Sequence, residues 1–192
     1  MMKIGITSDC SSGLEYAPFE HHIKITRTTI HFKDEELIDG IDIKAEEFYR
    51  RLKETDIVPS TSAPSLGEIS KRVEELKAEG CTDVIHFPIS FGLSAYGENL
   101  LNAFDNMVEG VKLHVFNCHS ACLMEGYCAH YAEILAERGY TVEEIMDECQ
   151  KFADQTVAYL IVDDLKYLVK NGRLNAVSGF IGGLAKIKPI LQ

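Results

Sequence analysis

Basic residues are scarce in this chain of 192 residues, and long apolar runs are missing. Lys and Arg total 19 against 30 Asp and Glu, which gives a formal net charge of −11 at pH 7. An acidic chain repels phosphate backbones, so sequence-independent nucleic-acid binding is disfavoured. No apolar run approaches the roughly 18 residues that a membrane span needs, and the first residues lack the pattern of a signal peptide. We therefore expect a soluble, cytoplasmic protein.

Paired cysteine motifs are absent as well. The six cysteines are expected to be free thiols, because no secretion signal is present. Three of them, Cys118, Cys122 and Cys128, share a short stretch with three histidines, and thiolate and imidazole are the ligands that zinc prefers. Without a Cys-x2-Cys pair, we favour small buried hydrophobes over a metal site, which stays the alternative. The sequence predicts no cofactor.

Nucleotide-binding loops are also missing, since neither G-x-x-x-x-G-K-[ST] nor G-x-G-x-x-G occurs. What the chain does have is a hydrophobic fraction of 46%, enough for a sizeable core. Its length fits one domain, or one domain and part of a second.

Strand-like and helix-like segments alternate along the chain. We expect strands at residues 3–7, 23–32, 83–89, 112–116 and 156–162, and helices at residues 44–54, 66–79, 95–107, 120–138, 141–153, 165–170 and 179–184. This alternation predicts βαβ crossovers and an α/β fold with a mostly parallel sheet and flanking helices.

Two helix starts carry the pattern of a capping box, in which a hydroxyl accepts from a free helix N–H while a Glu reaches back. They are Ser65-x-x-Glu68 and Thr141-x-x-Glu144. In the first of these helices the apolar side chains fall on one face, which we expect to be buried: Leu66, Ile69, Val73 and Leu76.

Three hydroxyl-rich turns, at residues 8–12, 60–65 and 90–94, follow or precede these elements. In a parallel sheet the ligand site lies outside the carboxyl ends of the strands. Hydroxyls combined with free N–H groups at a helix start can hold an anion. Thr61, Ser62 and Ser94 are therefore candidates for binding a carboxylate or a phosphate. The alternative is that they only cap helices.

Residues 92–97 offer an enzymatic alternative. The segment GLSAYG resembles a nucleophile elbow and lies between a predicted strand and a predicted helix. An elbow needs glycine two residues after the serine, and Gly97 is one place too far. A serine hydrolase that uses Ser94 is the less favoured hypothesis.

Six short motifs occur in a fixed order. They are SDCSS at 8–12, DGID at 39–42, PSTSAPS at 59–65, ISFGLS at 89–94, LKYL with GRL between 165 and 174, and LAKIKPIL at 184–191. Together they resemble the DegV family of bacterial fatty-acid-binding proteins, which includes the acyl-presenting subunits of fatty acid kinase.

The resemblance implies a DegV-like N-terminal α/β domain at residues 1–155 and a partial C-terminal α/β domain at 156–192. It implies that a long-chain fatty acid such as palmitate lies between the domains, with its carboxylate held by Thr61, Ser62 and Ser94. Burial of each CH2 contributes ~0.8 kcal/mol, so the tail supplies most of the affinity. The chain would then be no enzyme, and a separate kinase would act on the acid that it presents.

The chain also departs from the family pattern. The family continues beyond the last motif, so we expect a truncated second domain. Asn171 stands where the family has the first glycine of G-G-R, and Ala95 and Tyr96 alter the turn after Ser94. The alternative hypothesis is a non-binding structural homologue that forms a homodimer through residues 156–192.

Overall fold

The structure is a computed structural model that describes residues 3–103, 107–173 and 190–191. The helix expected at 179–184, and most of the motif at 184–191, lie outside the described residues. Among the described helices, none is long and apolar enough to cross a membrane.

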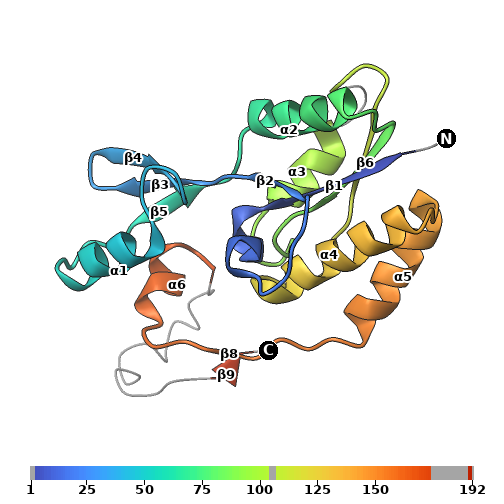
Figure 1. The fold of residues 1–192 in the computed structure, drawn as a ribbon. Coiled ribbons are helices and arrows are strands. Elements are labelled where there is room, and N and C mark those ends of the chain that lie inside the picture. Colours follow the sequence, from blue (N-terminus) through green and yellow to red (C-terminus); the bar gives the residue numbers. More distant parts are fainter. Residues whose placement is uncertain (1–2, 104–106, 174–189, 192) are drawn as a thin grey trace.

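A four-stranded sheet, sheet A, forms the centre of the molecule (Figure 1). Its strands are β1 (Ile4–Asp9), β2 (Lys24–Thr26), β6 (Asp83–Phe87) and β7 (Lys112–Val115). They lie in the order β2-β1-β6-β7, and every pair is parallel. The predicted parallel sheet is confirmed, although β1 continues through Ser8 and Asp9, which we expected in a turn.

Helices cover both faces of sheet A (Figure 1). The helices α2 (Leu66–Ala78) and α3 (Tyr96–Ala103) lie on one face, and α4 (Leu123–Glu137) and α5 (Val142–Asp154) lie on the other. A hydrophobic core lies on each face of sheet A. Successive side chains of β6 point into these two cores alternately, because side chains alternate along a strand. Val84 packs with α2 and α3 residues, whereas Ile85 and Phe87 pack with α4 and α5 residues.

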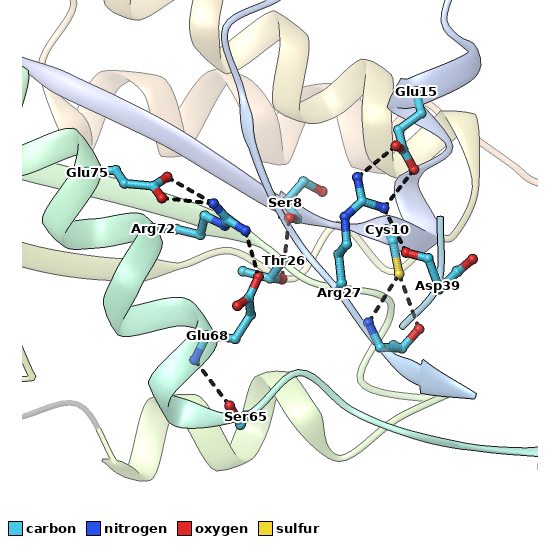
Figure 2. A network of polar contacts seen from close by, with 11 residues as sticks. Ser8, Cys10, Glu15, Thr26, Arg27, Asp39, Ser65, Glu68, Arg72 and Glu75 are labelled. Atoms are coloured by element: carbon cyan, nitrogen blue, oxygen red, sulfur yellow. Dashed lines mark hydrogen bonds and ion pairs between the residues drawn. The ribbon is translucent and has the colours of Figure 1, made fainter. Parts of the chain in front are cut away.

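The start of α2 confirms one half of the expected capping box. The Ser65 hydroxyl accepts from the Glu68 backbone N–H at 3.1 Å. The Glu68 carboxylate binds Arg72 at 2.9 Å instead of returning to Ser65, and Arg72 also binds Glu75 (Figure 2). The box at Thr141 and Glu144 is complete.

The buried face of α2 is confirmed at three of the four expected positions. Ile69, Val73 and Leu76 are buried, whereas Leu66 is 51% exposed. Leu66 is the first residue of the helix. It therefore lies outside the hydrophobic core, which only the later turns of the helix contact.

We expect Ser65→Ala to lower the free energy of unfolding by about 1 kcal/mol, because the Glu68 N–H would lose its acceptor. Urea titration followed by circular dichroism measures this change. Glu68→Gln serves as the comparison, because it leaves the cap bond in place. A Ser65→Ala protein as stable as the parent would contradict the capping role.

A smaller antiparallel sheet, sheet B, lies beside sheet A (Figure 1). Its strands are β4 (Glu35–Ile38), β3 (Thr29–Phe32) and β5 (Ser60–Ser62), in that order, and α1 (Ala45–Lys53) connects β4 to β5. The segment expected as one or two strands at 23–32 is therefore two strands in two sheets. Strand β5 falls within a segment that we expected to be a turn.

The last described segment contains α6 (Lys166–Lys170) and a two-stranded ladder of β8 (Leu160–Ile161) and β9 (Ile190–Leu191). The strand expected at 156–162 is wrong except at two residues. Asn171, at the end of α6, donates to the Pro59 carbonyl at 3.2 Å and so ties this segment to the start of β5. The fold is α/β, with the parallel sheet A between helices and the antiparallel sheet B beside it. The domain boundary at residue 155 stays a prediction.

Candidate functional site

A cavity of about 390 Å³ lies where three parts of the chain meet. These parts are the turns that follow β1 and β6, sheet B with the loop after it, and the α6 segment. Its volume falls in the ~300–1,000 Å³ range of small-molecule sites.

The topology of sheet A explains the position of the cavity. Strands β1 and β6 are neighbours, and the chain leaves β1 toward β2 on its other side. Ligand sites of open α/β sheets lie at such a switch point, outside the carboxyl ends of the strands. The Asp9 carboxylate, at the end of β1, accepts from the Ile89 N–H at 2.9 Å and joins the two turns. The cavity therefore lies where the sequence analysis expected a ligand site, and its use as a binding site stays a prediction.

The structure brings Thr61 and Ser94 to the same cavity but not Ser62. Thr61 and Ser62 are consecutive residues of β5, and consecutive side chains of a strand point to opposite faces. The Ser62 hydroxyl is 2.6 Å from Nε2 of His31, whose other ring nitrogen is 3.6 Å from Glu36. A ligand role for each of the three hydroxyl residues stays a prediction, and the geometry favours Thr61 and Ser94.

Ser94 lies just before α3 and also acts locally. Its hydroxyl oxygen accepts from the Tyr96 N–H at 3.2 Å. A hydroxyl that accepts one hydrogen bond still has its own proton to donate. Ser94 can therefore cap the turn and bind an anion at the same time. The described residues that line the cavity include no histidine, and a nucleophilic serine needs such a base.

The cavity carries charges that the sequence analysis did not select. Asp9, Asp39 and Arg173 line it together with the hydroxyls. Asp9 is 1% exposed, and its carboxylate accepts from the Ser11 N–H at 2.9 Å as well as from Ile89. All three charged residues fall within the sequence motifs at 8–12, 39–42 and 165–174. Membership of these motifs was therefore the sequence feature that could have identified them as residues of the site.

Arg27 fixes one wall of the cavity (Figure 2). Its guanidinium binds the Glu15 carboxylate at 2.7 Å and donates to the Asp39 carbonyl at 2.8 Å. Gly40 follows with a φ of 73°, a conformation that favours glycine. A Cβ atom at this position would also collide with the Arg27 guanidinium. The backbone conformation and the nearby Arg27 guanidinium together explain why the 39–42 motif has glycine at position 40.

The Cys10 thiol lies in the cavity wall and contacts Thr28. Its sulfur is 3.2 Å from the Thr28 hydroxyl and 3.4 Å from the Thr28 nitrogen. Burial raises the pKa of Cys10 to about 11. The thiol is therefore neutral under ordinary conditions.

Beneath the cavity lies Glu125, a fully buried residue of α4 that the sequence analysis missed. Its two carboxyl oxygens contact the hydroxyls of Ser8 at 3.1 Å and Ser11 at 2.8 Å. Burial, and next the negative charge of Asp9, raise the pKa of Glu125 well above its usual range. Glutamate also occurs at positions 133 and 137 of the same helix, so the sequence alone did not single out Glu125.

The cysteines near residue 120 do not form a metal centre in the described part of the chain, where no group of three or more His, Cys, Asp or Glu is placed to hold a metal ion. Cys118 and Cys128 are buried in the core with Cys149, and Cys122 is exposed. The expected packing role is confirmed for Cys118 and Cys128 and is wrong for Cys122.

Comparisons with known proteins agree with this architecture. A family model described as "Uncharacterised protein, DegV family" matches residues 3–192. A DegV domain-containing protein of Staphylococcus aureus is 35% identical over 193 residues, covering 100% of this chain and 67% of the relative. The chain thus spans about two thirds of the length of this relative.

Two solved structures share the fold over the whole chain. DegV from Bacillus subtilis, described as a fatty acid binding protein, has a TM-score of 0.85 at 31% identity. A fatty acid binding DegV family protein from Streptococcus agalactiae has a TM-score of 0.87 at 26% identity. Both comparisons cover 100% of this chain and 68% of the other chain. With its family model, relatives and fold in agreement, the chain belongs to the DegV family.

Proposed function

We propose that this protein binds a long-chain fatty acid and holds the carboxylate between Thr61 and Ser94. The observation that carries the proposal is the convergence of Thr61, in sheet B, and Ser94, in the loop between β6 and α3, on one cavity at the carboxyl ends of β1 and β6. Each hydroxyl can donate its proton to a carboxylate oxygen.

The chemistry of the cavity suits an amphipathic acid. Apolar side chains of Ala63, Pro64, Ile89, Leu93 and Leu168 line it beside the polar residues. An alkyl chain gains ~0.8 kcal/mol for each CH2 that it buries, and the hydroxyls then set the orientation of the acid. The Asp9 carboxylate repels a ligand carboxylate less than its charge alone suggests, because two backbone N–H groups bind it.

The relatives support the same ligand class. The Bacillus subtilis and Streptococcus agalactiae proteins are both described as fatty acid binding. Binding without catalysis is part of our proposal, as is presentation of the bound acid to a separate kinase. A homodimer that covers the apolar residues near β8 is the second candidate, because Val157, Tyr159 and Ile161 are exposed.

We expect organic extracts of the purified protein to contain a long-chain fatty acid in a near-stoichiometric amount. Mass spectrometry identifies the acid, and added palmitate should replace it after delipidation. The same extraction from an unrelated protein purified from the same host controls for lipid carry-over. Absence of any fatty acid, together with no uptake of palmitate, would contradict the proposed function.

A further inference from the structure

Two buried hydroxyls beneath the cavity contact more acceptor atoms than they have protons. The Ser8 hydroxyl lies 2.8 Å from the Phe87 carbonyl oxygen and 3.1 Å from Oε1 of Glu125. The Ser11 hydroxyl contacts Oδ1 of Asp9 and lies 2.8 Å from Oε2 of Glu125. Each hydroxyl has one proton. Two protons therefore face four acceptor atoms, so two of the four contacts lack a proton, and a proton added to a carboxyl group would fill one of them.

The contacts of the two carboxyl groups indicate which one carries that proton. Asp9 accepts from the backbone N–H of Ser11 at Oδ1 and from that of Ile89 at Oδ2, both at 2.9 Å, so both of its oxygens already serve as acceptors. The oxygens of Glu125 contact hydroxyls, which can accept as well as donate. A protonated Glu125 can donate to Ser8 while Ser8 donates to the Phe87 carbonyl. Three of the four contacts then contain a proton, and the Ser11 proton lies between Asp9 and Glu125.

We propose that Glu125 acts as a neutral carboxylic acid that positions the turn after β1, and that its ionisation weakens binding of a carboxylate ligand in the cavity. The inference rests on the proposed function. The groups that face Glu125 are Asp9 at the end of β1 and Cys118 in the loop after β7, besides the two serines.

The direction of the pH effect follows from these neighbours. Burial and the charge of Asp9 raise the pKa of Glu125. Below that pKa the cluster contains one negative charge, which the two N–H groups stabilise. Above it, a second negative charge lies beneath Ser11, a residue of the cavity wall, and repels the ligand carboxylate. Affinity therefore decreases as the pH rises through the pKa of Glu125.

The test measures binding of cis-parinaric acid, a fluorescent fatty acid, from the acid to the alkaline end of the pH range in which the protein stays folded. For the parent protein we expect affinity to fall about tenfold, as for two charges roughly 10 Å apart at an effective dielectric constant of about 20. Glu125→Gln keeps a neutral donor and acceptor, so its affinity should change much less. The fluorescent acid has the same titration in every sample, so the difference between profiles reports on the protein.

Glu133→Gln is the matched control. Glu133 is also a buried glutamate of α4, but its partners are the His22 N–H at 2.7 Å and His130, and neither of these residues lines the cavity, whereas Ser11 does. This variant should follow the parent profile. Equal pH profiles for the parent and Glu125→Gln would overturn the proposal while leaving fatty acid binding intact.

A measurement without ligand separates the two proposals. Infrared spectroscopy of the folded parent protein at neutral pH should show the absorption of a neutral carboxyl group. Loss of that band in Glu125→Gln, but not in Glu133→Gln, would support the assignment. Its absence from the parent protein would overturn the inference, even if Glu125→Gln fails to fold. Absence of binding by all proteins at every pH would contradict the proposed function instead.

Discussion

Replacement of Thr61 by Val and Ser94 by Ala together should lower the affinity for palmitate about 100-fold. Each change removes one of the two hydroxyls that we propose as donors to the ligand carboxylate, and a hydrogen bond to a charged group contributes about 1.5–3 kcal/mol. The single variants should each lose about tenfold, because each keeps one donor. Isothermal titration calorimetry with delipidated protein measures these affinities.

Ser62→Ala provides a control on the same strand. Ser62 is adjacent to Thr61, but its hydroxyl contacts His31 on the opposite face of sheet B. Its affinity should remain within about twofold of the parent, since surface changes of this kind have effects within about 0.5 kcal/mol. A loss in Ser62→Ala as large as that in Thr61→Val would show that the strand as a whole, and not the cavity-facing hydroxyl, determines binding.

Gly126→Ala should lower the free energy of unfolding by about 1–3 kcal/mol, the usual range for an overpacked site. A Cβ atom at residue 126 would lie 2.7 Å from the Ser12 carbonyl oxygen and 3.1 Å from Leu14. This backbone oxygen belongs to the turn Cys10–Ser12, so the clash would push α4 away from that turn. Chemical denaturation measures the loss of stability.

Gly67→Ala is the matched comparison for this prediction. Gly67 also lies in the first turn of a helix, α2, but a Cβ atom there would come no closer than 3.7 Å, to the Ser65 hydroxyl. This change should stabilise the protein by about 0.5–1 kcal/mol, because alanine loses less conformational freedom than glycine. A Gly126→Ala protein with parental stability would show that the contact between α4 and the turn is loose.

Local pattern predicted the parallel sheet well because its strands and helices carry strong signals. Val84, Ile85 and Phe87 form an apolar run that suits a strand buried on both faces. The completed capping box at Thr141 and Glu144 predicted the start of α5 correctly. Both signals act over a few residues, so they are visible without knowledge of the fold.

Sheet B and the cavity depend on contacts that such patterns do not contain. Strand β5 consists of Ser60, Thr61 and Ser62, which have a turn-like composition, and its pairing with β3 decides its conformation. That pairing also separates Thr61 from Ser62, which appeared equivalent in the sequence. Asp9 and Glu125 are 116 residues apart in number, and only the packing of α4 against β1 unites them. No local pattern marks such a pair.

The neutral Cys10 thiol should react only slowly with an electrophilic group bound next to it in the cavity. With a pKa of about 11, roughly one thiol in ten thousand is ionised at pH 7, and the thiolate is the form that attacks electrophiles. Peroxides and alkylating reagents should therefore modify this side chain slowly. Under the proposed function, an activated acyl derivative next to Cys10 would form a thioester with this thiol only slowly.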